Sequence, residues 1–137
     1  MNRRASLVFV FLFLAVLFAA VPKAVGQSAK QKREAAYQAA LQSYSVILKP
    51  GMTRKSVEDY LHEKAITYQT MCCVDERSAY ADLVKIGKEK HPWYCSEHNV
   101  YIAFQFIDDP HEGLRISGRD SDKLKSITIY HWLEGCL

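Results

Sequence analysis

Glycine and proline are scarce in this chain, with six and four occurrences among 137 residues. Collagen-like and low-complexity proteins need far more of both, so these two classes are excluded. Hydrophobic residues make up 49% of the chain and charged residues 24%, an ordinary globular composition that also excludes a wholly disordered protein. The length predicts one folded domain.

The chain also lacks a large excess of either charge. Its small positive excess comes from residues near the N-terminus. The chain has 18 Lys and Arg against 15 Asp and Glu. Two arginines precede Leu7–Val21, an unbroken apolar run that is shorter than the roughly 20 residues of a membrane-spanning helix. Ala24 and Gly26 then give the small-residue pattern of a cleavage site. We therefore predict a signal peptide over residues 1–26, cleaved after Gly26, with an uncleaved anchor as the alternative.

The part of the chain after the signal peptide has no net charge. Arg3, Arg4 and Lys23 leave with the signal, so basic and acidic residues balance in residues 27–137. Nucleic-acid binding needs a basic surface, and we therefore expect no nucleic-acid partner. We expect an exported protein, periplasmic or secreted, that meets a membrane only through the signal segment before cleavage. Residues 27–137 are expected to form a single domain.

The cysteines lack the C-x-x-C spacing of zinc sites and thiol oxidoreductases. All four lie in the exported portion, where disulfide bonds persist: Cys72, Cys73, Cys95 and Cys136. A bond between the two adjacent cysteines would be strained. We therefore expect Cys95 to pair with Cys72 or Cys73. The other member of the adjacent pair is then left for Cys136.

Hydrophobic periodicity predicts two helices at the start of the domain. The first covers residues 27–49 and places five side chains on a common face: Tyr37, Ala40, Leu41, Tyr44 and Leu48. Pro50-Gly51 ends this helix with a tight turn. Thr53 is then a suitable N-cap for a second helix over residues 54–64. The side chains that this helix should bury are Val57, Tyr60, Leu61 and Ala65.

The rest of the chain predicts strands. Four segments show alternation or no helical period: residues 66–73, 82–87, 99–107 and 123–133. Two helices followed by strands indicate an α+β fold, with both helices packed on one face of a three- to four-stranded antiparallel sheet. Val100 and Phe104 should face the helices, and Tyr101 should lie on the opposite face.

Motifs of known catalytic chemistry are missing as well. The H-E-x-x-H zinc motif, the G-x-S-x-G turn and glycine-rich phosphate loops are all absent. Five histidines are scattered without ligand spacing, and the acidic residues of the loop over 108–122 lack the spacing of an EF-hand. We therefore expect no catalytic residue, no cofactor and no bound metal. A small metal-dependent or hydrolytic enzyme that uses the His91–His98 turn is the alternative function.

The segment Leu48–Leu61 reads LKPGMTRKSVEDYL. It resembles the helix–turn–helix signature of the SmpA/OmlA, or BamE-like, family of small outer-membrane lipoproteins, whose fold is shared by β-lactamase-inhibitor-type domains. In that signature a turn like Gly51-Met52-Thr53 precedes a helix with residues like Val57 and Leu61. The resemblance implies two helices followed by an antiparallel sheet. It also implies non-catalytic protein binding by a small exported scaffold.

Aromatic and arginine side chains supply the expected partner surface. Such side chains carry much of the binding energy at protein interfaces. The sheet face without helices and the long loop over residues 108–122 together offer five of them: Tyr101, Tyr130, Trp132, Arg115 and Arg119. The sequence therefore predicts an exported, non-catalytic protein-binding module that contacts another protein through these residues.

Overall fold

The computed structural model describes residues 28–72, 74, 80–107 and 118–137. The predicted signal peptide therefore lies outside the described residues, as do Cys73, Arg115 and most of the loop over 108–122. Residues Arg33–Leu137 form one compact unit. None of the helices in the described ranges combines the length and the apolar content that crossing a membrane requires.

The first helix, α2 (Ala29–Ile47), has the predicted buried face. Its start is capped reciprocally: the Gln31 N–H donates to Ser28 Oγ, and the Ser28 N–H donates to Gln31 Oε1. The side chains that α2 and the residues just after it place against the core are those expected from the periodicity: Tyr37, Ala40, Leu41, Tyr44 and Leu48. The predicted amphipathic helix is therefore confirmed.

A tight turn and an N-cap start the second helix, α3 (Arg54–Glu63). Gly51 has a φ of 90°, a conformation that glycine adopts without steric cost. Thr53 Oγ1 accepts the Ser56 N–H at 3.2 Å, as an N-cap does. The helix is one residue shorter than predicted, and the expectation that Ala65 is buried is wrong. Ala65 is exposed with a φ of 53°, because the chain leaves the helix before it.

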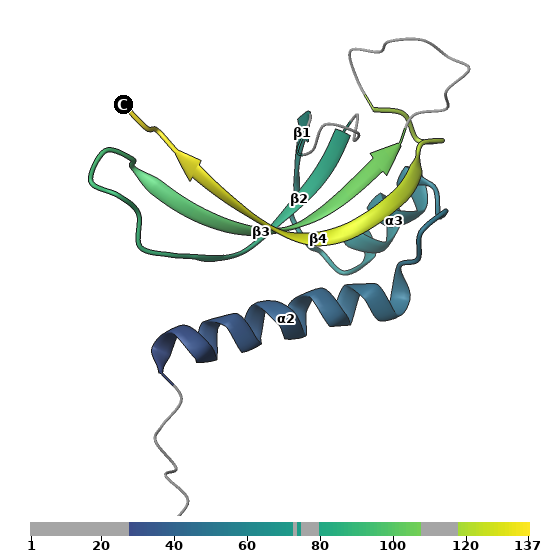
Figure 1. Cartoon of the computed structure of the whole chain (residues 1–137). Coiled ribbons are helices and arrows are strands. Elements are labelled where there is room, and N and C mark those ends of the chain that lie inside the picture. Colours follow the sequence, from purple (N-terminus) through teal and green to yellow (C-terminus); the bar gives the residue numbers. More distant parts are fainter. Residues whose placement is uncertain (1–27, 73, 75–79, 108–117) are drawn as a thin grey trace, which may run out of the picture. The chain divides into compact units, whose positions relative to one another are not determined.

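Four antiparallel strands follow, paired in chain order: β1 (Gln69–Cys72), β2 (Tyr80–Lys88), β3 (Glu97–Ile107) and β4 (Lys123–Glu134). Both helices lie on the same side of this curved sheet (Figure 1). Phe104 and Ile102 of β3 are fully buried there with Leu48 and Val57 from the helical half. The predicted α+β fold is therefore confirmed, with four strands.

A β-bulge in β2 changes which side chains face the helices. Lys85 stands opposite Tyr101, but Gly87 stands opposite Val100, so Ile86 has no partner on β3. The alternation of inward and outward side chains shifts by one residue at this point. Gly87 then faces the helices, and a Cβ there would lie 2.7 Å from the Tyr37 ring. Glycine is needed at this position because the ring of Tyr37 fills the space.

A buried ion pair connects α3 to the sheet. The Arg54 guanidinium, which is 7% exposed, donates to both oxygens of the fully buried Asp82 carboxylate at 2.7 and 3.1 Å. It also donates to Glu58 at 3.1 Å and to the Thr70 hydroxyl at 3.0 Å. The guanidinium carbon lies 5.6 Å from the centre of the Phe106 ring. One side chain of α3 therefore contacts three strands of the sheet.

The disulfide pairing predicted for Cys95 is wrong. Cys95 is bonded to Cys136, and Cys72 is in a disulfide whose partner lies outside the described residues. Strand order explains the difference. Cys95 precedes β3 and Cys136 follows β4, so the two meet at one end of neighbouring antiparallel strands. Cys72 lies at the other end of the sheet, about 30 Å away along the strand direction.

Candidate functional site

The aromatic side chains of the predicted binding surface are less accessible than expected. Tyr101 is only 4% exposed, and its hydroxyl donates to the Glu134 carboxylate at 3.0 Å. Burial and the hydrogen bond with Glu134 raise the pKa of Tyr101. Tyr130 and Trp132 are half-buried and pack against the small apolar cluster to which Tyr101 belongs. Tyr101 is therefore a core residue of the sheet face opposite the helices.

The structure does not bring the predicted arginine and tryptophan together. Arg119 is exposed, and its N–H donates to the Asp122 carboxylate at 2.7 Å, just before β4 begins. Trp132 lies near the other end of β4, about 30 Å along the strand. Arg115 lies outside the described residues. The four predicted residues that the structure describes therefore do not form one compact patch.

A polar pocket of about 320 Å³ lies on the sheet face opposite the helices. Glu97 and Glu134 stand opposite each other there, and the Asn99 amide nitrogen donates to both carboxylates at 2.8 and 2.6 Å. Lys88 binds Glu97 at 2.8 Å, and Lys85 lies 3.7 Å from it. The hydrogen bonds from Lys88 and Asn99 lower the pKa of Glu97 to about 2. These two carboxylates and two ammonium groups balance in charge.

The most exposed aromatic side chains lie on the loop between β2 and β3. Trp93 is 89% exposed, and Tyr94 beside it is also exposed. Their rings meet edge to face, with centroids 5.9 Å apart. We call this pair the aromatic tip. The aromatic tip is not among the residues predicted for the partner surface, although an aromatic pair directly before Cys95 and between two strands is a usable signal.

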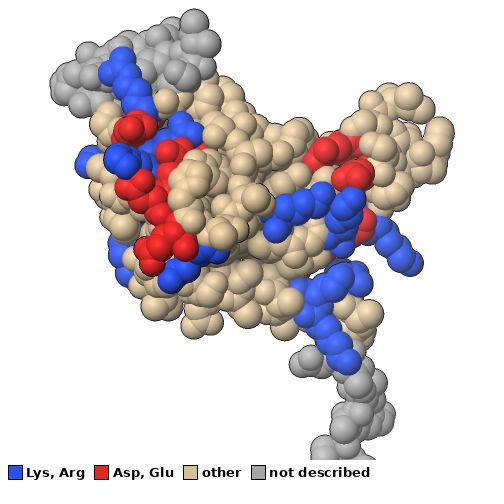
Figure 2. All heavy atoms as spheres, turned by 180° about the vertical axis from the view of Figure 1, so that it is seen from behind, with Lys and Arg blue, Asp and Glu red and all other residues tan. Residues whose placement is uncertain are grey.

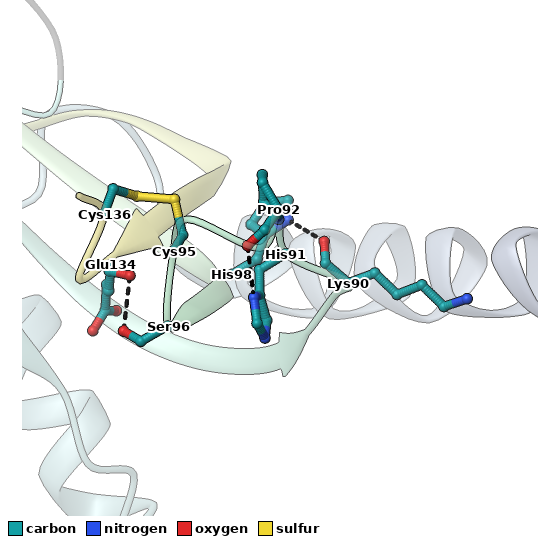
Figure 3. Close-up of a disulfide and its surroundings, with 8 residues drawn as sticks. All are labelled: Lys90, His91, Pro92, Cys95, Ser96, His98, Glu134 and Cys136. Atoms are coloured by element: carbon teal, nitrogen blue, oxygen red, sulfur yellow. Dashed lines mark hydrogen bonds between the residues drawn. A yellow bond between two sulfur atoms is a disulfide. The ribbon is translucent and has the colours of Figure 1, made fainter.

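The loop that carries the aromatic tip is held to the end of β4. Cys95 is bonded to Cys136, and Ser96 donates both its N–H and its hydroxyl to the Glu134 carbonyl at 2.9 Å (Figure 3). The Leu137 N–H donates to the Tyr94 carbonyl at 2.9 Å. These bonds tie the backbone on one side of the tip to the C-terminal residues. The aromatic tip therefore lies on a loop that a disulfide bond and hydrogen bonds fix to the C-terminal residues.

Charged side chains lie in two groups on the face that Figure 2 shows, with uncharged surface between them. One group mixes acidic and basic side chains, and in the other several basic side chains lie together below a few acidic ones. Several of the ion pairs in the fold are exposed, such as Lys55 with Asp59 at 2.8 Å.

Comparisons with known proteins assign no family to the chain. No protein-family model, no curated protein and no solved structure matches it. The resemblance to the SmpA/OmlA signature stays a prediction. Its two structural elements, the turn at Gly51 and the N-cap at Thr53, are present in the fold.

Proposed function

We propose that this protein is an exported, non-catalytic protein-binding module and that the aromatic tip contacts the partner. One observation carries the proposal: Trp93 is 89% exposed on a loop that a disulfide bond holds. Leaving apolar surface in water costs roughly 25 cal/mol per Å². Tryptophan and tyrosine are also the side chains most enriched at the energetic centres of protein interfaces. An exposed pair of them is therefore suited to burial by a partner.

The anchoring of the loop also favours binding. A partner that buries a flexible loop must offset the entropy lost when the loop is ordered. The Cys95–Cys136 bond and the hydrogen bonds of Ser96 restrict the loop before any partner arrives. Less binding energy is then spent on ordering the aromatic tip.

Three further features support the export and the binding role. The disulfides suit an oxidising compartment outside the cytosol, as expected for a chain with a signal peptide. The balanced charge of residues 27–137 favours a protein partner over a nucleic acid. The resemblance at Gly51–Leu61 points to scaffolds that bind other proteins.

Site-specific photocrosslinking tests the proposal. A photoreactive phenylalanine analogue replaces Trp93 in one variant and Gln42, an exposed residue of α2, in a matched control. Both variants are expressed in the source cells and irradiated. We expect a discrete adduct with one partner protein from position 93 and none from position 42. The adduct is identified by mass spectrometry.

A binding measurement with the identified partner then quantifies the contact. Trp93→Ala should weaken binding by about 30-fold, the equivalent of the roughly 2 kcal/mol of an interface hot spot. Gln42→Ala should bind as the wild type does, and both variants should keep the wild-type circular dichroism spectrum. Adducts only from a third position, Trp132, would place the contact on the sheet instead. A purified protein that turns over a substrate would overturn the non-catalytic assignment.

A further inference from the structure

Three potential metal ligands from separate segments meet on the helix-facing side of the sheet. Glu89 follows β2, while His98 lies in β3 and His131 in β4. One ligand atom from each side chain lies within 4.8 Å of the other two, and the two imidazole centroids are 5.5 Å apart. We propose that Glu89, His98 and His131 bind a divalent transition-metal ion such as Zn²⁺.

The register of the strands explains why these three side chains converge. His98 stands opposite Leu133 and His131 opposite Val100, so the two histidines are diagonal neighbours on one face. The Glu89 N–H donates to the His98 carbonyl at 2.9 Å, which places Glu89 opposite His98. The bulge in β2 is essential here. Without it, the alternation that puts Lys85 on the opposite face would put Glu89 there too.

A backbone hydrogen bond prepares His98 for coordination. His98 Nδ1 lies 3.2 Å from the Lys90 carbonyl oxygen (Figure 3). A carbonyl oxygen only accepts, so Nδ1 carries a proton and donates it to this bond. The Nε2 atom of the neutral imidazole then keeps its lone pair for a metal ion. Histidines that ligate metals usually make such a second hydrogen bond, because it fixes the tautomer and the ring orientation.

The donor set matches the chemistry of zinc. Two imidazole nitrogens and one carboxylate are a known set for Zn²⁺, with water at the fourth position. At bond lengths of about 2.1 Å, tetrahedral coordination places neighbouring ligand atoms about 3.4 Å apart. The ligand atoms, which lie within 4.8 Å of one another, therefore need to approach by at most about 1.4 Å. His131 is exposed, so rotation of its side chain can provide this movement.

One of the three ligands borders a cavity, and another contacts α2. A cavity of about 460 Å³ is lined by Glu89 together with Arg33, Lys88, Lys90 and His91. The Tyr37 ring of α2 meets the His131 ring edge to face at 6.5 Å. Glu89 therefore borders the cavity, and His131 packs against α2.

Metal titration of the purified, untagged protein with its disulfides intact tests the site. Isothermal calorimetry measures Zn²⁺ binding, and the absorption spectrum of added Co²⁺ reports the coordination geometry. We expect one equivalent to bind in the wild type, with a tetrahedral Co²⁺ spectrum. His131→Asn and the nearly isosteric Glu89→Gln should each weaken Zn²⁺ binding by at least about 100-fold. His91→Asn is the matched control, because His91 borders the cavity but is not one of the three ligands.

Thermal unfolding of each variant without metal shows whether it is folded. A folded His131→Asn variant that binds Zn²⁺ as the wild type does would overturn the proposal. Wild-type binding weaker than about 1 mM would overturn it as well. Loss of binding in His91→Asn with full retention in His131→Asn and Glu89→Gln would show that the loop, and not the sheet, holds the ion.

Discussion

Replacing Asp82 with alanine removes the carboxylate that balances the buried Arg54 guanidinium. Asp82 accepts hydrogen bonds from two nitrogens of Arg54 and from the Thr70 hydroxyl, at 2.7 to 3.1 Å. Among the described residues, Arg54 then keeps hydrogen bonds to Glu58 and Thr70, with the Asp122 carboxylate as a further nearby charge. A charged group that is 7% exposed then lacks its main counterion in the interior.

The expected loss of unfolding free energy follows from this burial. Breaking a buried ion pair by removing one partner typically costs about 3–5 kcal/mol. Glu58 still neutralises part of the charge at 3.1 Å, so we expect the lower end, about 3 kcal/mol. For a domain of this size, 1 kcal/mol corresponds to a change in Tm of about 4 °C. The melting temperature of Asp82→Ala should therefore fall by about 12 °C.

Urea unfolding followed by circular dichroism measures this difference, with two further variants as controls. Asp59→Ala removes an exposed ion pair with Lys55 on the same helix and should leave the midpoint nearly unchanged. The double variant Arg54→Met with Asp82→Leu replaces the pair with apolar side chains and should recover most of the lost stability. If Asp82→Ala unfolds at the same urea concentration as Asp59→Ala, the buried charge does not matter and the reasoning is refuted.

Two other changes test the turn and the pocket. Gly51→Val should lower the unfolding free energy by about 1–3 kcal/mol through backbone strain alone, because no atom lies within 4 Å of the added Cβ. An unchanged urea midpoint would remove the assigned role of Gly51 in the turn. Glu97 has its pKa lowered from 4.5 to about 2 in the folded chain, so the unfolded chain takes up the proton first as the pH falls. Stability should therefore decline between pH 4.5 and about 2, and Glu97→Gln should show a shallower decline in urea unfolding across that range. Equal slopes for the two proteins would contradict this.

Local patterns predicted most of the fold. Periodicity predicts a helix over 27–49 and a strand over 99–107, and the observed α2 and β3 begin and end within two residues of these bounds. The turn at Gly51 and the cap at Thr53 follow from residue type, because few residues satisfy those backbone positions. These features depend on neighbours in the sequence, and the sequence therefore contains enough information to predict them.

Features that depend on strand order and register could not be predicted in the same way. The Cys95–Cys136 pairing requires knowing that β3 and β4 are neighbours and which of their ends meet. The burial of Tyr101 depends on the side chains across two strand pairs, since its face of the sheet carries an apolar cluster of its own. The group formed by Glu89 and the two histidines depends on a bulge that no residue spacing indicates.

The bulge at Ile86 divides β2 into two parts, and the alternation of side chains between the two sheet faces is shifted by one residue from one part to the other. If the strand ran straight from Lys85, Lys88 would stand opposite His98, and Glu89 would turn to the other face. An ammonium group would then replace a carboxylate beside two imidazoles, without any change in amino-acid sequence. Deleting Ile86 leaves the pairing of Gly87, Lys88 and Glu89 with β3 unchanged, because Ile86 has no partner on β3. Flattening the bulge with Ile86 present shifts this pairing by one residue. The sign of the charge at this end of the sheet is thus set by whether Ile86 is bulged out of the strand or paired within it.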